Sequence, residues 1–244
     1  QMTIDRFRGF LTWERVFVVT TTREYGLIIR KQAPMIPLQN ILIEPIRRNT
    51  TMAHGLGAIY IKKIDPEAVI ITDSADHPIK NVGAYLKNYL ISAQVALGGD
   101  FLVTTGIIPK FPHTGFGYVK AGELYQKING VPVYKIDSFN EKPDLATARK
   151  YIESGQYYWH ANLFVWRAES ILRAIKKYHL PSYKALEKIS DAIGKPEEKK
   201  IIEAAYREAP EIAIEYSVAE KAKNLYIVEA NFDWEDVGNW KVVY

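Results

Sequence analysis

Short runs of β-branched and aromatic residues alternate with longer segments of helical periodicity, and this alternation limits the fold more than any other feature of the sequence. The short runs predict strands at residues 16–21, 68–73, 100–107, 130–136, 157–166 and 225–232. Residues 50–63 and 82–97 are predicted to be helices, the second because its apolar residues recur at close to helical spacing. Alternating strands and helices indicate an α/β fold with a mixed, mostly parallel sheet flanked by helices.

Residues 168–208 are predicted to be mainly helical, with breaks at Pro181 and at the Gly-Lys-Pro sequence of residues 194–196. We expect this stretch to form a helical subdomain laid on the sheet. The chain has 244 residues and shows no internal repeat or obvious linker. It is therefore predicted to form a single domain over residues 1–244.

Composition excludes several classes of protein. The chain has no cysteine, which excludes disulfides, cysteine-ligated zinc and thiol catalysis. A dispersed net charge of +4 argues against a nucleic-acid partner but is compatible with an anionic small-molecule substrate. Because no apolar run approaches the roughly 20 residues of a membrane span, and residues 1–10 lack a signal-peptide pattern, we expect a cytoplasmic location and no membrane partner.

Acidic residues follow the apolar strand predicted at residues 68–73, in the sequence DSADHP (73–78). In an open α/β sheet, ligands bind beyond the carboxyl ends of the strands. A carboxylate at that place suits Mg2+, which prefers oxygen ligands. This segment is therefore a candidate metal site. The alternative is a solvated turn in which Asp73 or Asp76 caps the next helix.

The sequence ILIEPIRRNTT (41–51) indicates an apolar strand, a turn stiffened by proline and the start of a helix, with Asn49 or Thr50 as its N-cap. Arg47 and Arg48, beside the helix N-terminus, suit an anion or a base edge. The alternative is an ordinary strand-to-helix turn with solvated arginines.

Two further segments carry candidate ligand-binding residues. The two glycines of TGFGYVKAG (114–122) permit close approach of a ligand to the backbone, although a plain turn explains them equally well. In FNEKPD (139–144), Lys142 can act as a point charge for a phosphate and Glu141 can accept hydrogen bonds from sugar hydroxyls. The alternative there is an exposed Glu-Lys pair ahead of a Pro-Asp helix start.

The order of the motifs is more informative than any one of them. EPIRRNTTMAHGLGA, DSADH, GIIPKFPHTGFGYV, EKPDLATARKYIESGQYYWHANLFVW, IEYSVAEK and FDWEDVGNW follow one another across nearly the whole chain. Together they resemble the mannose-1-phosphate guanylyltransferases (GDP-mannose pyrophosphorylases) of the sugar-phosphate nucleotidyltransferase superfamily. The EP-x-x-RNT segment and the WEDVGNW ending favour the mannose branch over the glucose-1-phosphate uridylyl- and thymidylyltransferases.

The resemblance implies a Rossmann-like nucleotidyltransferase fold and an enzyme. The implied reaction transfers GMP from GTP to mannose 1-phosphate and gives GDP-mannose and pyrophosphate, with Mg2+ as cofactor. Positioning of the substrates and neutralisation of their charge would provide most of the catalysis, as in other phosphoryl transfers. A homodimer is compatible with this resemblance.

Matching the family's motifs residue by residue implies specific roles. Asp76 and Asp236 correspond to the Mg2+ ligands, and Lys142 to the contact with the sugar phosphate; these three are the implied catalytic residues. The implied sugar-binding and nucleotide-binding residues are Glu141 at the hexose hydroxyls, Gly117 and Tyr118 through their backbone, Glu44, Arg48 and Asn49 near the guanine, and Glu215 facing the cleft.

Residues 159–164, WHANLF, depart from the family's WN-S-G-x-F pattern. His160 replaces an asparagine that would hydrogen-bond the sugar, and Asn162 replaces the glycine that follows. An imidazole can still donate one hydrogen bond, and Asn162 can act in part as the replacement. Because a mispaired polar group discriminates strongly between epimers, another hexose 1-phosphate is an alternative substrate.

Family members begin with a strand and a Gly-rich, Arg-containing loop that wraps the nucleotide phosphates. This sequence begins at QMTIDRF, which resembles the helix after that loop, and it ends soon after GNW, where the family commonly has a C-terminal extension. A fragment, an omission of residues present in the molecule and a degenerate homologue each explain the difference at the front. We expect a chain without the loop to catalyse poorly, so a non-catalytic sugar-nucleotide-binding or regulatory homologue is the alternative. The retained Asp76, Asp236 and Lys142 favour the enzyme.

The sequence DWEDVGNW (233–240) carries three acids between two tryptophans. By the resemblance, Asp236 is the metal ligand, and Asp233 and Glu235 are expected to be structural. Trp234 and Trp240 are predicted to pack the turn against the sheet so that Asp236 points inward.

Overall fold

A computed structural model describes residues 2–230 and 232–234 of the chain. The chain divides into two compact units, each built from two separate stretches. The first comprises Gln1–Ala68 and Ala168–Lys221, and the second comprises Val69–Arg167 and Ala222–Tyr244. Whether the two units act as the single domain expected from the sequence stays a prediction. Within the described part of the chain, no helix has both the length and the apolar character needed to cross a membrane.

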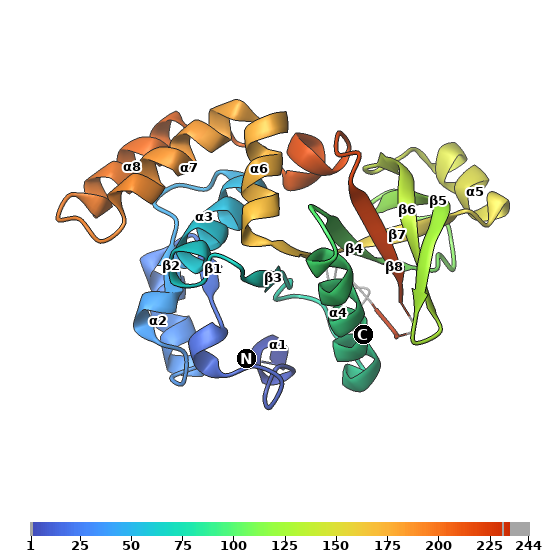
Figure 1. The fold of residues 1–244 in the computed structure, drawn as a ribbon, viewed down its shortest axis with the longest axis horizontal. Coiled ribbons are helices and arrows are strands. Elements are labelled where there is room, and N and C mark those ends of the chain that lie inside the picture. The colour runs from blue at the N-terminus through green and yellow to red at the C-terminus, as the bar shows by residue number, and fades with distance from the viewer. Residues whose placement is uncertain (1, 231, 235–244) are drawn as a thin grey trace. The chain divides into compact units, whose positions relative to one another are not determined.

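The first unit is mainly helical (Figure 1). Its elements are, in chain order, α1 (Met2–Asp5), η1 (Trp13–Arg15), β1 (Val18–Thr20), α2 (Arg23–Gln32), η2 (Leu38–Asn40), β2 (Ile41–Ile43), α3 (Asn49–Ile64), α6 (Ala168–Tyr178), α7 (Leu180–Ala192), α8 (Glu198–Glu208) and the π-helical turn η3 (Glu215–Ala219). Strands β1 and β2 pair in parallel, with Val18 opposite Ile41. Helix α3, predicted at residues 50–63, packs on α6 and α7.

Helices α6, α7 and α8 account for most of residues 168–208. Pro181 lies in the first turn of α7, where its missing N–H has no helical partner to lose. The chain turns between α7 and α8 at Gly194, whose φ of 85° is a left-handed conformation that favours glycine. The proline and the Gly-Lys-Pro sequence therefore mark helix boundaries, as predicted.

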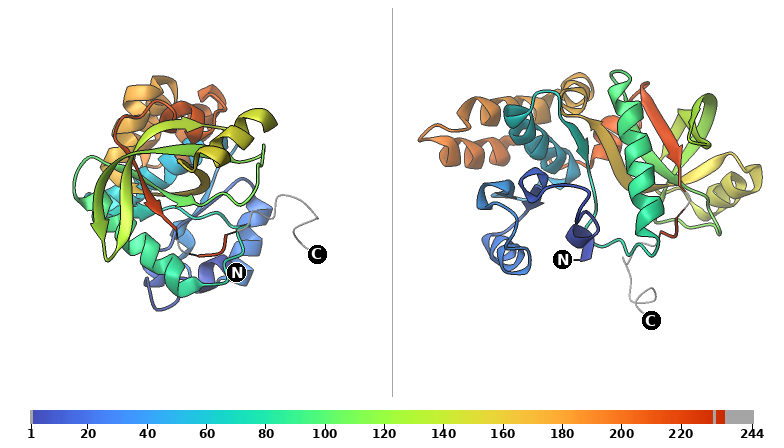
Figure 2. Two further views of the ribbon diagram at one scale, coloured as in Figure 1. Left: turned by 90° about the vertical axis from the view of Figure 1, so that its right-hand side faces the viewer. Right: turned by 60° about the horizontal axis from the view of Figure 1, so that its bottom comes forward.

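The second unit is built on a six-stranded sheet. Its elements are β3 (Val69–Ile71), α4 (Val82–Leu97), β4 (Leu102–Ile107), β5 (Gly117–Ile128), β6 (Val131–Asn140), α5 (Leu145–Ser154), β7 (Tyr157–Arg167) and β8 (Leu225–Glu229). The strand order is β3-β7-β4-β8-β6-β5, and a further β5–β7 pairing returns the ladder to β7. Helix α4 packs on β3, β4, β7 and β8 and is seen lengthwise against the sheet in the right-hand view of Figure 2.

The α/β class and the mixed sheet flanked by helices are confirmed, but the predicted excess of parallel pairings is wrong for the described strands. Only the β1–β2 and β4–β8 pairings are parallel. The β3–β7, β4–β7, β5–β6, β5–β7 and β6–β8 pairings are antiparallel. The reason is β7, which inserts between β3 and β4 in the opposite direction, together with the β5–β6 hairpin.

Each strand that the sequence predicted is present with slightly different ends, but β5 was missed. Its first three residues are buried, whereas Glu123 to Lys127 are exposed. This outer half has the polar composition of a surface segment and lacks a regular apolar alternation. Strand β4, in contrast, is buried along its whole length and shows the continuous apolar character of a central strand.

Candidate functional site

Three strands of the second unit meet where Glu141 leaves the end of β6. Gly117 begins β5 and pairs with His160 of β7, and Tyr118 pairs with Asn140, the last residue of β6. Glu141 therefore emerges beside the start of β5, and only 12% of its side chain is exposed. The structure brings together Gly117, Glu141 and His160, which the sequence distributes over three separate motifs.

The absence of a side chain at Gly117 admits the Glu141 carboxylate. A Cβ atom at Gly117 would lie 2.5 Å from Oε2 of Glu141 and 3.4 Å from Cβ of His160. The first distance is far inside van der Waals contact. Gly117 is thus required by the close approach of Glu141, and a plain turn does not explain it, because the residue begins a strand.

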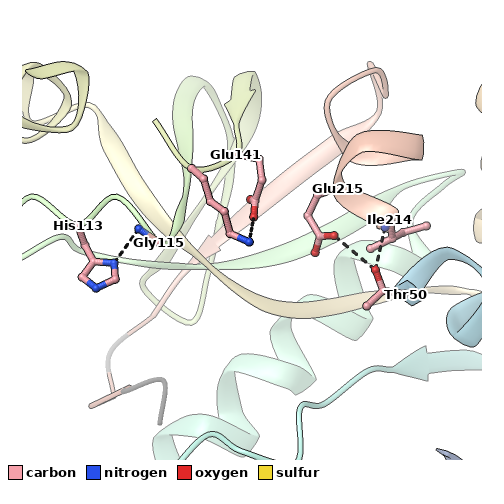
Figure 3. A network of polar contacts seen from close by, with 7 residues as sticks. Thr50, His113, Gly115, Glu141, Ile214 and Glu215 are labelled. Atoms are coloured by element: carbon pink, nitrogen blue, oxygen red, sulfur yellow. Dashed lines mark hydrogen bonds and ion pairs between the residues drawn. The ribbon is translucent and has the colours of Figure 1, made fainter. Parts of the chain in front are cut away.

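Lys142 adopts a left-handed backbone with φ of 50°. Such a conformation costs a non-glycine residue roughly 1–2 kcal/mol, and strain of this kind clusters at ligand sites. Its Nζ lies 3.7 Å from Oε1 of Glu141 (Figure 3), and 59% of its side chain is exposed. An ion pair this exposed contributes little to stability, so the ammonium can meet an anion from solution. The Pro-Asp helix start that follows is confirmed, because Asp144 caps α5.

Tyr118 has a structural side chain. It is fully buried, and its hydroxyl accepts the backbone N–H of His113 at 3.0 Å. His113 in turn accepts the N–H of Gly115 at 3.1 Å (Figure 3) and stacks on Phe116. The Tyr118 side chain therefore has its partner within the protein, and the implied backbone contact of Tyr118 with a ligand stays a prediction.

Strand β7 is irregular at the residues that depart from the family pattern. Thr104 of β4 pairs with Phe164, and Gly106 pairs with His160. The pairing therefore advances by two residues along β4 but by four residues along β7. Bulges of this kind are common beside active sites. Asn162 lies in the bulge with φ of 52°, and asparagine tolerates the left-handed region better than most residues with a side chain. This conformation explains why an asparagine can stand where the family has glycine.

Asp76 lies in the loop between β3 and α4, and 67% of its side chain is exposed. The next residue, His77, is buried, and its Nδ1 accepts the indole N–H of Trp234 at 3.2 Å. Trp234 also contacts Phe116 edge to face and forms an isolated bridge with Ile79. The loop that carries Asp76 is thus tied to residues 232–234. Trp234 contacts two loops, and its predicted packing against the sheet stays a prediction.

The other acids near this loop have separate positions. Helix α4 is capped by Asn81, whose Oδ1 accepts the N–H of Ala84 at 3.0 Å, so neither Asp73 nor Asp76 caps it. Asp233 forms an exposed ion pair with Lys110 at 3.7 Å. The predictions for Glu235, Asp236 and Trp240 fall outside the described residues.

The Asp76 loop fits the cation that the resemblance implies. Its carboxylate offers exposed oxygen atoms, the ligands that Mg2+ prefers, and the neighbouring His77–Trp234 contact fixes the loop. Over residues 2–230 and 232–234, no group of three or more His, Cys, Asp or Glu side chains is arranged to hold a metal ion. Mg2+ commonly uses one or two carboxylates and substrate phosphates, so it does not need such a group.

Glu44 is a buried carboxyl group of the first unit. It follows β2, is 4% exposed, and its Oε1 accepts the hydroxyl hydrogen of Tyr206 at 3.1 Å. Burial raises the pKa of Glu44 from 4.5 to about 7, although the Tyr206 hydrogen bond and the charge of Arg47 oppose this rise. A carboxyl group that titrates near neutrality can present a donor or an acceptor to a ligand.

Arg48 has a structural partner that the sequence did not indicate. Its Nε donates to the carbonyl oxygen of Tyr206 at 2.7 Å, and its Nη2 donates to the carbonyl oxygen of Arg207 at 3.0 Å. Both carbonyls belong to the last turn of α8, where helical partners are missing. Asn49 has φ of 62°, and its Oδ1 accepts the N–H of Thr50 at 2.8 Å. Arg48 therefore anchors α8, and its predicted contact with guanine is not needed to explain it.

Glu215 begins the π-helical turn η3 and is buried. Its Oε2 accepts a long hydrogen bond of 3.5 Å from the Thr50 hydroxyl, which itself accepts the N–H of Ile214 at 2.8 Å (Figure 3). Thr51 and Ser217 share a further hydrogen bond of 2.7 Å. The start of α3 and η3 thus form one polar network within the first unit, and π-helical turns are frequent at functional sites.

Sequence reasoning missed Thr104 and Tyr206. Thr104 hydrogen-bonds His160 across two strands, and Tyr206 hydrogen-bonds Glu44 from 162 positions away. Neither residue lies in a recognisable motif, because each acts through a contact that exists only after folding. The polar content of the buried strand β4 was the one available signal for Thr104.

Comparisons with known proteins identify the family of the chain. The family described as Nucleotidyl transferase matches residues 2–244. Mannose-1-phosphate guanylyltransferase of Escherichia coli K12 is 32% identical over 233 residues, which are 93% of this chain and 48% of that protein. Mannose-1-phosphate guanylyltransferase RfbM of Salmonella typhimurium LT2 is 33% identical over 248 residues, which are 100% of this chain and 50% of that protein.

A solved structure has a similar fold over nearly the whole chain. The crystal structure described as mannose-1-phosphate geranyltransferase from Thermus thermophilus matches with a TM-score of 0.86 and 27% identity. The match covers 99% of this chain and 66% of that one. This chain spans about half the length of the curated relatives it matches. The family match covers more than half of the chain, and the chain therefore belongs to the nucleotidyl transferase family.

Proposed function

We propose that this chain forms the site at which GMP is transferred from GTP to mannose 1-phosphate, giving GDP-mannose and pyrophosphate. The observation that carries the proposal is the arrangement of Glu141 and Lys142 beside Gly117. A nearly buried carboxylate next to an exposed ammonium suits a ligand that bears both hydroxyls and a phosphate. The similarity to mannose-1-phosphate guanylyltransferases supports mannose as the hexose and guanine as the base.

In this proposal, the residues of the second unit hold the sugar phosphate. Glu141 accepts hydrogen bonds from hexose hydroxyls, and Lys142 neutralises the phosphate. The Gly117 backbone and His160 complete the sugar side. A phosphate oxygen of the sugar phosphate attacks the α-phosphorus of GTP, and the bond to the β-phosphate breaks to release pyrophosphate. Positioning and charge neutralisation lower the barrier of such a transfer.

The nucleotide side is assigned to the first unit. Glu44 and Asn49 are proposed to contact the guanine, and Glu215 to line the nucleotide side through its network with Thr50. Mg2+, held by Asp76 together with Asp236, would neutralise the crowded phosphate charge when bound. No ligand contact is proposed for Arg48, because its guanidinium donates to two carbonyl oxygens at the end of α8.

The test measures pyrophosphate release from GTP and mannose 1-phosphate by the purified protein and two variants. Lys142→Gln should raise the KM for mannose 1-phosphate by tenfold or more, because about 1.4 kcal/mol of binding to the phosphate corresponds to that factor. Lys127→Gln is the matched control, because Lys127 is an exposed lysine of β5 in the same unit. It should leave the KM unchanged.

Two results would contradict the proposal. The first is a failure of the wild-type protein to release pyrophosphate from this substrate pair. The second is an equal effect of the Lys142 and Lys127 substitutions. The hexose is tested separately with a panel of hexose 1-phosphates, because His160 stands where the resembling family has asparagine. A higher kcat/KM for another hexose would keep the reaction class and replace mannose as the substrate.

A further inference from the structure

Helix α2 of the first unit packs beside β2 (Figure 1), and its contacts show which of its faces is turned inward. Gly26 is buried, and a Cβ atom there would lie 3.0 Å from Cδ1 of Ile43. Ile29 packs against the apolar cluster that contains Ala33 and Ile41. Positions 26, 29 and 33 follow helical spacing, so they mark the inner face of α2.

The opposite face of α2 is apolar at its centre. Leu27 is 58% exposed and Ile28 is 48% exposed, although the outer face of a surface helix is normally polar. Glu24 lies one turn before this pair, and Lys31 lies one turn after it. Because the four residues are spaced at i, i+3, i+4 and i+7, they form one row, which we call the α2 stripe.

The charges at the two ends of the α2 stripe are available to a partner. Glu24 and Lys31 are both exposed. Neither side chain forms an ion pair with another residue in the described ranges 2–230 and 232–234. The stripe therefore presents an acid, two apolar side chains and a base, in this order, to whatever covers it.

This order is complementary to itself in the antiparallel direction. A second α2 laid antiparallel, with a two-fold axis between Leu27 and Ile28, brings Glu24 of each copy opposite Lys31 of the other. The apolar side chains of both copies then meet at the axis. In a parallel pair, like charges would lie opposite each other and repel. The charges therefore favour the antiparallel arrangement, in which the same surface serves both copies.

We propose that the α2 stripe is the interface with a second copy of this chain, in an antiparallel dimer of two-fold symmetry. One helix face is smaller than the roughly 1,000 Å2 that a stable interface buries. We therefore expect a weak dimer, with a dissociation constant on the order of 10–100 µM. The inference does not depend on the proposed function, because no residue of the stripe is assigned there.

Sedimentation velocity of the whole chain, from about 1 µM to about 1 mM, tests the apolar centre. The wild-type protein should pass from monomer to dimer as its concentration rises. Leu27→Gln should raise the dissociation constant by about tenfold or more, because it puts a polar group at the axis. Ile64→Gln is the matched control, because Ile64 is an exposed apolar residue at the end of α3 in the same unit. It should leave the dissociation constant unchanged.

Charge reversal tests the antiparallel arrangement. Glu24→Lys makes both ends of the stripe basic, and Lys31→Glu makes both ends acidic, so each variant alone should dimerise about tenfold or more weakly. A mixture of the two variants should form mixed dimers, because every opposed pair is then an acid and a base. The double variant Glu24→Lys/Lys31→Glu should dimerise as the wild-type protein does. Glu187→Lys, which makes the same charge change at an exposed acid of α7, is the control.

The outcomes decide between a second copy and any other occupant. A wild-type protein that stays monomeric up to the highest concentration would overturn the proposal and leave the stripe to a different partner. Equal dimerisation of Leu27→Gln and Ile64→Gln would show that the dimer uses another surface and would also overturn it. Circular dichroism checks that each variant is folded, and the wild-type measurement is decisive without any variant. Dimers that are lost in the single charge variants and recovered in their mixture support the proposal.

Discussion

Oε2 of Glu141 occupies the space that a side chain at residue 117 would need, because a Cβ atom on Gly117 would lie 2.5 Å from it. Gly117→Ala should therefore push the carboxylate aside without unfolding the protein, since the displaced atom is the end of a flexible side chain. If Glu141 binds hexose hydroxyls, the affinity for mannose 1-phosphate should fall by about tenfold or more. Calorimetric titration of the variant with mannose 1-phosphate measures this loss.

Gly83→Ala is the matched control for that substitution. Gly83 lies in α4 of the same unit, and a Cβ atom there would meet its nearest atom, Oδ1 of Asn81, at an ordinary 3.7 Å. This variant should bind mannose 1-phosphate as the wild-type protein does. Equal affinities for the two variants and the wild-type protein would remove Glu141 from the sugar site.

Glu44 should make stability depend on pH between about 4.5 and 7. Burial raises its pKa to about 7, above the 4.5 of the unfolded chain, so the folded state holds the proton longer. The stabilisation is complete below pH 4.5 and is lost as the pH rises through 7, by about 3 kcal/mol in all. Glu44→Gln keeps an acceptor for Tyr206 and does not titrate.

The difference in Tm between Glu44→Gln and the wild-type protein isolates this contribution. We expect the variant to gain stability relative to the wild-type protein as the pH is raised from 5 to 8 in a series of thermal melts. Asp137→Asn, in an exposed ion pair with Lys120 in the other unit, serves as a control for carboxylate removal. A Tm difference for Glu44→Gln that stays constant over this range would show that Glu44 does not titrate there.

The sequence predicted most strands and helices because each is a local pattern. The helix at 82–97 has the predicted ends, and α3 differs by one residue at each end. The direction of the strands was not predictable in the same way. Strand β7 lies antiparallel between β3 and β4, and nothing in its own apolar run distinguishes that placement from a parallel one.

Candidate site residues were predictable as types but not as partners. Glu141 and Gly117 were both singled out, yet their contact depends on the β5–β6 and β5–β7 registers. Arg48 was interpreted as a ligand contact, and its two hydrogen bonds to the end of α8 depend on residues 158 and 159 positions away. A charged residue in a motif shows only that a partner is needed. The fold determines whether that partner is a ligand or the backbone.

Asn162 should tolerate glycine and reject β-branched residues. Its φ of 52° lies in the left-handed region, which costs a residue with a Cβ roughly 1–2 kcal/mol, and more when the Cβ is branched. Asn162→Gly should therefore match or exceed the wild-type stability. Asn162→Val should lose about 2 kcal/mol in the free energy of unfolding. Urea denaturation of the three proteins measures the differences, and equal losses for glycine and valine would show that backbone conformation does not determine this position.

Arg48 should behave as an anchor for α8. Arg48→Ala removes two hydrogen bonds from a charged donor to the carbonyl oxygens of Tyr206 and Arg207, and we expect a loss of about 2 kcal/mol in the free energy of unfolding. Arg48→Lys should recover part of this loss, because an ammonium cannot reproduce both guanidinium contacts. Arg47→Ala, which changes the exposed neighbouring arginine, should change stability by less than about 0.5 kcal/mol.

Thermal melts report the stability of the Arg48 and Arg47 variants, and fluorescence titration with GTP well below the Tm reports their affinity for the nucleotide. A large loss of GTP affinity with unchanged stability would instead assign Arg48 to the nucleotide.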